Sequence, residues 1–290
     1  MSTQEKTKDI PYNEAFFKTS HNSYEKSVRK QLNMGVRGLE YDIHDDKIQQ
    51  LGDFEVYHLQ NNIDVLLGKD GNPDDYLFSN WLKVLQDWSN NLNKEHAPIT
   101  LFVELKDSII DSNNKPNELF GIKKLNSIIT ESLEPKTLFT FKNFRENKFQ
   151  WPTVNELQGC VLIVLVSYWG GYWAASEGGF DSRVHYLRNC LEGKDDVCFV
   201  SWVQEDKGEK VSYLKENTHF WKCSLDYSTN NFAENNKSQR LTRADFDKIL
   251  WGRHVKTYFN KNYEKGYRCN FPATDAWGTD KYDNAFPWSI

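Results

Sequence analysis

Eight short apolar runs recur along the chain and are separated by more polar segments. Several are almost wholly apolar, such as VLIVLV at 161–166, which is typical of strands buried on both faces of a parallel sheet. The predicted strands are Ala15–Thr19, Gly38–Ile43, Ile99–Leu105, Val161–Ser167, Val197–Val203, His219–Leu225, His254–Phe259 and Tyr267–Pro272.

Helical patterns lie between most of these runs. Apolar residues recur at helical spacing in two sets, which are Phe78, Trp81, Leu82, Leu85, Trp88 and Leu92, and Leu119, Ile122, Leu125, Ile128, Ile129 and Leu133. Phe180–Leu191 also predicts a helix, and Thr242 with Asp245 three residues on predicts the start of another. Repeated alternation of strand and helix predicts the α/β class and a (β/α)8 barrel of the TIM type.

The predicted barrel occupies the whole chain as a single domain of residues 1–290. Residues 1–14 are expected to form a polar N-terminal tail, and the Asn-rich segment 226–239 a polar loop. The glycine-rich segment Ser167–Gly179 follows the fourth predicted strand, at the end of a barrel where active sites are built. We interpret it as an aromatic-bearing loop over that mouth, with an ordinary long connection as the alternative.

Composition narrows the classes of function. The formal net charge of −5 gives no support for nucleic-acid binding, and no run has the ~20 apolar residues of a transmembrane helix. The five cysteines show no Cys-x-x-Cys or Cys/His spacing, which argues against zinc. The N-terminus carries no apolar stretch of signal-peptide length, which taken literally predicts a cytoplasmic protein.

Polar residues that a plain core would not choose lie on or just after the first predicted strands. They are His21, Asn22, Glu40, Asp42, His58 and Glu104. Side chains alternate across a strand, so Glu40 and Asp42 share one face, as do Glu104 and Lys106. Buried carboxylates are costly unless a cation or hydrogen bonds offset their charge.

Oxygen ligands of this kind suit calcium or magnesium, and two histidines beside such a cation can exchange protons near neutral pH. The pattern therefore predicts a metal-assisted acid/base site. The alternative is a pair of salt-bridged strand residues, with Arg37 neutralising Glu40 or Asp42. His44 is in phase with Asp42 and is placed on the rim, whereas His96 is assigned to the surface.

The order of four motifs resembles the catalytic half of phosphatidylinositol-specific phospholipase C, and most of all its calcium-dependent bacterial branch. The motifs are SHNSY, QLNMGVRGLEYDIHD, VYHL and ITLFVELKD, all between Phe16 and Asp107. A weaker resemblance returns in WPTVNELQGCVLIVL and CNFPATD.

The resemblance implies specific roles. His21 and His58 match the catalytic histidine pair of the family. Of the two, His58 matches the general acid that protonates the departing glycerol oxygen. The positions that match calcium ligands are Asn22, Glu40, Asp42 and Glu104. Calcium is favoured over magnesium because the cup is anionic and has four protein ligands.

The implied substrate is a phospholipid at a membrane surface. Lys106 is predicted from strand alternation to hold a phosphate or an inositol hydroxyl, and Tyr168 and Trp169 to stack on the sugar-like ring or contact lipid. The implied reaction is attack of the inositol 2-hydroxyl on phosphorus, which releases diacylglycerol and a cyclic inositol phosphate. Such enzymes are often secreted. If a signal peptide was removed from the N-terminus of this sequence, secretion is the alternative to a cytoplasmic location.

Two alternatives compete with this hypothesis. Glycerophosphodiesterases and sphingomyelinase D-like enzymes also pair two histidines with Glu-x-Asp, but this chain has HNSY where the glycerophosphodiesterase pattern has an Arg-Gly pair. The other alternative is a barrel that binds lipid or inositol phosphate without turnover.

Overall fold

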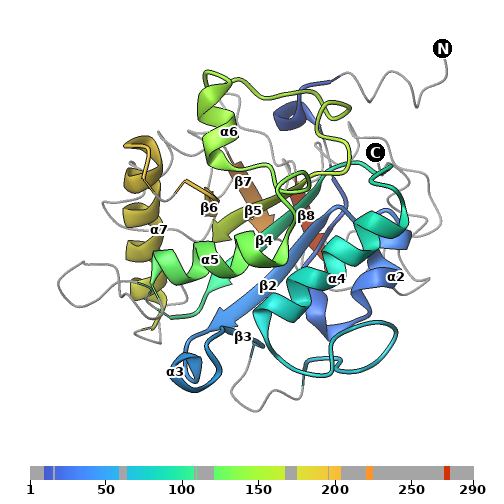
Figure 1. Ribbon diagram of the computed structural model, residues 1–290, viewed down its shortest axis with the longest axis vertical. Helices are drawn as coiled ribbons and strands as arrows, with labels where there is room; N and C mark the ends of the chain where they lie inside the picture. The colour runs from blue at the N-terminus through green and yellow to red at the C-terminus, as the bar shows by residue number, and fades with distance from the viewer. Residues whose placement is uncertain are drawn as a thin grey trace, which may run out of the picture.

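The computed structural model describes residues 10–15, 17–58, 64–107, 109, 121–166, 175–194, 196–203, 220–224 and 271–274 (Figure 1). The strands are β1 (Thr19–Ser20), β2 (Gly38–His44), β3 (Glu55–Val56), β4 (Ile99–Leu105), β5 (Val161–Val166), β6 (Phe199–Val203), β7 (Phe220–Ser224) and β8 (Phe271–Thr274). The helices are α2 (Val28–Asn33), α3 (Ile48–Leu51), α4 (Phe78–Asn91), α5 (Ile122–Ser132), α6 (Phe141–Glu146) and α7 (Ala175–Leu191), with the short 3-10 helices η1 (Tyr12–Glu14) and η2 (Ser23–Glu25).

In the described residues the strands form one eight-stranded sheet, in the order β1-β8-β7-β6-β5-β4-β2-β3. All neighbouring strands are parallel except β3, which runs antiparallel to β2. The two-residue β1 has two parallel neighbours, because Thr19 is in register with Gly38 of β2 and with Ala273 of β8. The carboxyl ends of β1, β2 and β4 therefore lie at the same end of the sheet.

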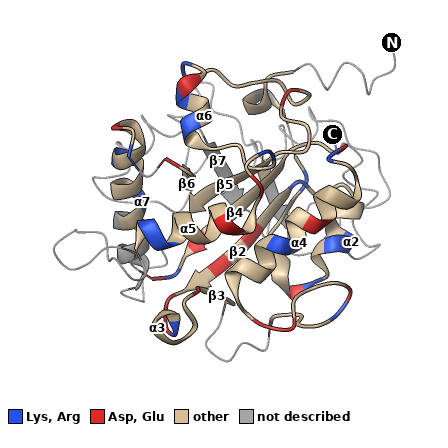
Figure 2. Cartoon of the chain, in the orientation of Figure 1, with Lys and Arg blue, Asp and Glu red and all other residues tan. Residues whose placement is uncertain are grey.

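The central strands are apolar because both of their faces are covered. Every residue of β4 and β5 is buried, and the side chains of β5 are all Val, Leu or Ile. β2 and β4 carry acidic residues among mainly apolar ones, and those of β2 are visible in Figure 2. A charge at such a position needs a reason beyond packing.

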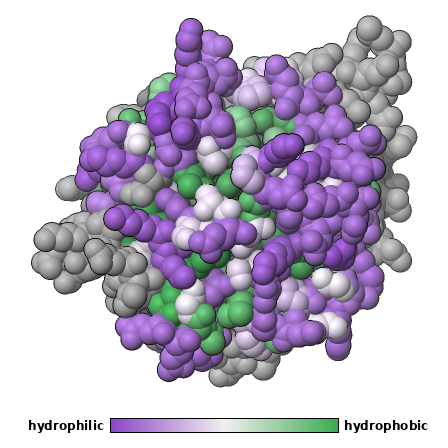
Figure 3. Space-filling view, in the orientation of Figure 1, coloured by the Kyte–Doolittle hydropathy of each residue, from purple (hydrophilic) through white to green (hydrophobic). Residues whose placement is uncertain are grey.

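Amphipathic helices cover the sheet. In α4 the residues that face inward include Phe78, Trp81 and Leu85, each 0% exposed, whereas Lys83 and Asp87 face solvent. The side of the molecule that α2 and α4 cover is mainly hydrophilic in Figure 3, as expected for the outer face of such helices. Among the described helices, none has the length and apolar character required to cross a membrane.

Helix starts follow from local capping chemistry. Ser27 accepts a hydrogen bond from the backbone N–H of Lys30 at the start of α2. Thr140 and Asn143 form a reciprocal capping box at the start of α6. Each cap satisfies backbone donors that have no partner within the helix.

The sequence prediction is confirmed for the mixed α/β fold with a parallel sheet. The bounds of β4 are as predicted, and α4 and α5 lie within the predicted periodic segments. The first strand begins later than predicted, at Thr19, and the last is Phe271–Thr274 rather than Tyr267–Pro272. His254–Phe259 and the helix expected at Thr242 lie outside the described residues.

Two features differ from the prediction. The antiparallel β3 was not predicted, because two residues show no recognisable alternation. The segment Ser167–Gly179 was interpreted as a loop, but α7 already begins at Ala175. The two adjacent glycines at 178 and 179 disfavour a helix locally, and this preference is overridden by the rest of a 17-residue helix.

Gly38 is expected to be intolerant of any side chain. A Cβ there would overlap Oγ1 of Thr19 and lie 2.7 Å from its Cγ2. We predict that Gly38→Ala lowers the free energy of unfolding by about 1–3 kcal/mol, measured by urea denaturation. Thr19→Ala in the same chain should restore part of that loss, because it removes both atoms. An unchanged unfolding midpoint in Gly38→Ala would contradict the packing of β1 against β2.

Candidate active site

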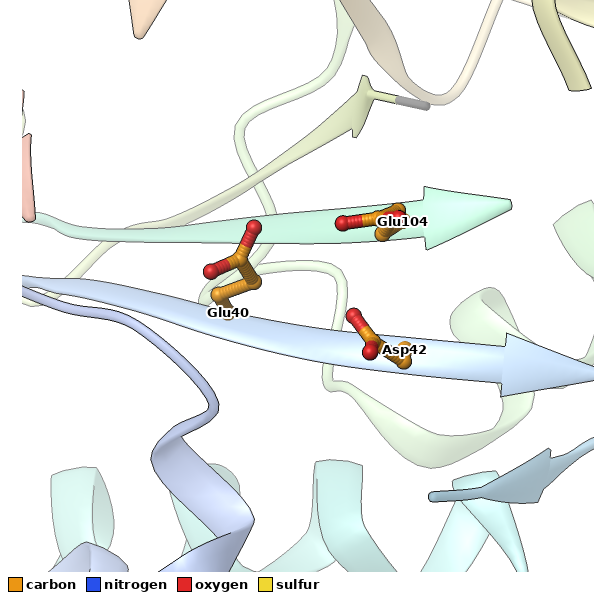
Figure 4. A group of neighbouring side chains, drawn as sticks. All are labelled: Glu40, Asp42 and Glu104. Carbon is orange, nitrogen blue, oxygen red and sulfur yellow. The ribbon is translucent and has the colours of Figure 1, made fainter. Parts of the chain in front are cut away.

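Three carboxylates are buried on two neighbouring strands. Glu40 and Asp42 lie two residues apart on β2, and Glu104 of β4 is in register with Asp42. Their exposed fractions are 1%, 0% and 7%. Figure 4 shows the three side chains close together on β2 and β4, and each offers an oxygen within 4.8 Å of the others. Negative charges this close in a buried place repel one another strongly, so the arrangement needs positive charge beside it.

Lys106 supplies positive charge at this place. Its Nζ lies 2.6 Å from Oε1 of Glu104 and 3.1 Å from Oδ2 of Asp42. Burial alone would lower the pKa of Lys106, but the two carboxylates outweigh it and raise that pKa above its usual value. Burial alone would likewise raise the pKa of Asp42, but Lys106 and the hydrogen bond with His58 lower it. Asp42 and Lys106 are therefore an ion pair at neutral pH.

Glu104 behaves differently although it contacts the same ammonium. Burial, with the nearby charges of Asp42 and Glu40, raises the pKa of Glu104 and outweighs the opposite effect of Lys106. One cation thus offsets only part of the negative charge of the three carboxylates.

Arg37, the alternative neutralising residue, is engaged elsewhere. Its Nη1 donates to the carbonyl oxygens of Leu32 and Val36, at 2.8 Å each, and its guanidinium lies over the ring of Trp88. Within the described ranges it forms no ion pair with a carboxylate. The alternative in which Arg37 neutralises Glu40 or Asp42 is therefore not supported: Arg37 satisfies carbonyls at the end of α2, and the adjacent cation, Lys106, follows β4.

His58 follows β3 and contacts the same cluster. Its Nδ1 lies 2.7 Å from Oδ2 of Asp42 and 3.4 Å from Nζ of Lys106. Nδ1 cannot serve both partners, because the carboxylate accepts a hydrogen bond and the ammonium donates one. The shorter contact is with Asp42, so we assign Nδ1–H as the donor to Asp42. This hydrogen bond raises the pKa of His58. It also leaves Nε2 as the nitrogen that can exchange a proton with a ligand.

His21 and Asn22 come directly after β1. The side chain of His21 is one-fifth exposed, and its Nε2 lies 3.7 Å from Oε2 of Glu40. Asn22 adopts a left-handed backbone conformation with φ of 44°, which asparagine tolerates better than most residues. Its Nδ2 donates to Glu25, at 2.9 Å, which fixes the orientation of the side-chain amide.

Two residues of SHNSY were missed by sequence reasoning. The hydroxyl of Tyr24 lies 2.9 Å from Oδ2 of Asp42 and 3.1 Å from Oδ1 of Asn22, so it joins two predicted ligands. Oγ of Ser23 accepts the backbone N–H of Glu40, at 2.9 Å. Their positions inside the motif were the available signal, but a hydroxyl by itself has too many common roles to be assigned.

A second acidic group lies where β2 and β4 end. It consists of Asp45, Asp46 and Asp107. Asp107 accepts the backbone N–H of Asp45, at 3.0 Å, and lies 3.4 Å from Nδ1 of His44. Burial, with the charge of Asp107, raises the pKa of Asp45 to about 6. The ring of His44 stacks on Tyr57 with 3.9 Å between centroids, at the end of β2 where a rim position was expected.

Two other assignments can be compared with the structure. His96 is 5% exposed, and its Nε2 lies 2.7 Å from Oγ of Ser89, so its assignment to the surface is wrong. The polar connection that carries His96 packs against α4, which sequence polarity does not reveal. Tyr168 and Trp169, the predicted substrate contacts, lie outside the described residues and stay predictions.

The carboxylate cluster fits a hard divalent cation. Oδ1 of Asp42 is buried and accepts no hydrogen bond from the part of the chain that the structure describes. An unsatisfied buried carboxylate oxygen is costly, and it is an available ligand atom. With the oxygens of Glu40 and Glu104, and the amide oxygen of Asn22 beyond Tyr24, the donor set is oxygen-rich and anionic, as calcium prefers.

Comparison with known proteins identifies solved structures that share the fold of this chain. No protein-family model and no curated protein sequence matches the chain. Solved structures do match. A calcium-dependent phosphoinositol-specific phospholipase C from a Gram-negative Pseudomonas species, in a myoinositol complex, matches with a TM-score of 0.59 and 16% identity over 95% of this chain and 94% of that chain. A Ca²⁺-dependent phosphatidylinositol-specific phospholipase C from Streptomyces antibioticus matches with a TM-score of 0.54 and 14% identity, over 95% and 98% of the two chains.

The chain has the fold of these phospholipases C.

The phospholipase C fold explains why the polar residues meet. In a parallel sheet the carboxyl ends of successive strands lie side by side, so residues that follow β1 and residues late in β2 and β4 converge. His21, Glu40 and Glu104 are far apart in sequence and come together only through this topology.

The bond between His58 and Asp42 predicts the behaviour of one titration. In metal-free protein, Asp42→Asn should lower the pKa of His58, followed by NMR of the imidazole C2–H. Because the folded pKa is raised, the stability contributed by this bond is fully present below the unfolded pKa of about 6.5 and is lost as pH rises through the folded value. His96, whose pKa is lowered by burial, is the internal control and should titrate unchanged. Equal His58 pKa values in the two proteins would refute the assigned bond.

Proposed function

We propose that the protein is a calcium-dependent phosphodiesterase that cleaves phosphatidylinositol. The observation that carries the proposal is the group of buried carboxylates on β2 and β4 with a histidine on either side, His21 near Glu40 and His58 on Asp42. Two of the solved structures that share its fold are described as calcium-dependent phospholipases C of this specificity. The products would be diacylglycerol and a cyclic inositol phosphate.

The proposed calcium ligands are Asn22, Glu40, Asp42 and Glu104. Their burial and oxygen chemistry support this set, as does the unsatisfied Oδ1 of Asp42. Calcium bound there would supply positive charge that favours loss of the proton from the inositol 2-hydroxyl and offsets charge on the phosphate.

His58 is the proposed general acid toward the departing glycerol oxygen. The bond with Asp42 supports this role in two ways, because it holds the proton on Nδ1 and raises the pKa of the ring. A protonated Nε2 can then donate to the leaving oxygen near neutral pH. The role of Asp42 toward His58 is thus to orient the ring and stabilise its charged form.

His21 is the proposed phosphate contact. It lies one-fifth exposed beside Glu40, so its imidazole can reach a ligand at the open side of the cluster. Glu40 or Glu104 would accept the proton of the inositol 2-hydroxyl, because both carboxylates lie at the proposed metal site.

Substrate binding is assigned to Lys106, Tyr168 and Trp169. Lys106 is placed beside the carboxylates and retains its charge, which suits a phosphate or an inositol hydroxyl. The two aromatic residues would stack on the inositol ring or contact the lipid surface.

We also infer that residues 1–290 form one barrel-type domain. Support comes from β1, which pairs with β2 on one side and with β8 on the other. The second described strand and the last one thus meet at β1.

Cleavage of phosphatidylinositol vesicles tests the proposed reaction. With calcium, ³¹P NMR should detect a soluble cyclic inositol phosphate, and excess chelator should abolish it. His58→Ala should lower the rate by about 10²–10⁴-fold, because the leaving oxygen loses its proton donor. His96→Ala is the matched control and should retain the rate. Acyclic products alone would contradict attack by the 2-hydroxyl.

Measurements of calcium affinity distinguish between the two acidic groups as the metal site. Isothermal titration calorimetry should show that Glu40→Gln and Glu104→Gln lose most calcium affinity, because each removes a charged ligand. Asp46→Asn removes one charge from the rim group and should bind calcium as the wild type does. Loss of affinity in Asp46→Asn but not in Glu40→Gln would move the metal centre to the rim.

A further inference from the structure

Lys106 contacts two of the three carboxylates that the proposed metal ion would bind. Its Nζ lies 2.6 Å from Oε1 of Glu104 and 3.1 Å from Oδ2 of Asp42. Oδ2 of Asp42 also receives His58 and Tyr24, at 2.7 and 2.9 Å. This carboxylate therefore has hydrogen-bond donors around one oxygen, while its other oxygen has none among the described residues.

The contacts of Lys106 are those of an internal cation rather than of a surface ion pair. Asp42 is 0% exposed, and the side chains of Glu104 and Lys106 are 10% and 17% exposed. Ion pairs on the surface contribute little, but an ammonium facing a fully buried carboxylate cannot be removed without leaving that charge uncompensated. Lys47 and Glu55 show a contrast for the cation, because the side chain of Lys47 is 52% exposed whereas that of Glu55 is 5% exposed.

A calcium ion and this ammonium would be very close together. Calcium binds carboxylate oxygens at 2.3–2.6 Å, so an ion on Oε1 of Glu104 would lie at most about 5 Å from Nζ in its observed position. Like charges at that separation inside a protein repel strongly. The ammonium also occupies one oxygen of Glu104 and one of Asp42, which leaves fewer oxygens of the cluster open to a metal ion.

We propose that Lys106 is an exchangeable counterion of the carboxylate cluster, so that metal binding and the contacts of Lys106 with Asp42 and Glu104 exclude each other. The inference rests on the proposed function for the place of the metal. Metal-free protein keeps Nζ on the two carboxylates, and the arriving cation displaces it.

The side chain of Lys106 can move its ammonium away from the cluster. Lys106 lies just after the end of β4, and its flexible four-carbon stem allows Nζ to move without the backbone. The neighbouring His58 side chain is 38% exposed, which marks the open side of the cluster. An ammonium released toward that side would face an anionic group of the ligand, so metal loading would prepare phosphate binding.

Calorimetry of Lys106→Met tests the exclusion. Methionine keeps the unbranched apolar stem and removes the charge, so calcium should bind at least about tenfold more tightly than in wild type. Lys106→Arg, which keeps the charge, should not show this gain. Lys94→Met removes one positive charge from the Glu134 pair, before β4 begins, and controls for net charge.

A residue-resolved measurement on wild-type protein covers the case in which Lys106→Met does not fold without metal. Reductive methylation followed by mass spectrometry should show that calcium increases the reactivity of Lys106. Lys30, paired with Asp70 on the surface, should react equally with and without calcium.

The outcomes separate the two proposals. Wild-type protein that binds calcium, with Lys106→Met binding equally or more weakly and Lys106 reactivity unchanged, overturns the exclusion and leaves the proposed function standing. Absence of calcium binding in both wild type and Lys106→Met overturns both the calcium assignment and the exclusion.

Discussion

The architecture of the site depends on one electrostatic constraint, which is that three carboxylates share a buried place on two adjacent strands. Glu40, Asp42 and Glu104 are tolerated there only because positive charge and hydrogen-bond donors surround them. The donors come from separate parts of the chain: Tyr24 follows β1, His58 follows β3 and Lys106 follows β4. The constraint thus ties four segments to one point.

Asp42 is the centre of this arrangement. Its Oδ2 accepts hydrogen bonds from the imidazole of His58 and the hydroxyl of Tyr24 and contacts the ammonium of Lys106. Its Oδ1 has no hydrogen bond among the described residues. One oxygen therefore organises protein side chains, and the other is free for a ligand. Because one carboxylate contacts His58 through Oδ2 and offers Oδ1 to a ligand, the pKa of His58 is coupled to the charge of the ligand that binds there.

Strongly periodic segments were predictable, and short or non-local ones were not. Ile99–Leu105 was bounded correctly because apolar residues are flanked by polar connections, and strand alternation correctly brought Lys106 to Glu104. In contrast, β3 has two residues and exists through its pairing with β2. The partners of Arg37 and the burial of His96 also depend on tertiary packing, which local polarity does not encode.

The pairing of the two-residue strand β1 affects the order in which the parts of the candidate site form during folding. Thr19 pairs with Gly38 nearby in sequence and with Ala273 near the other end of the chain. Contacts of such long sequence separation form slowly, because the intervening chain must be ordered before they are gained. His21 and Asn22 follow β1 directly, so the active site would be among the last parts of the molecule to assemble. During synthesis, the acidic strands β2 and β4 would be in place well before the segment that completes the sheet beside β1.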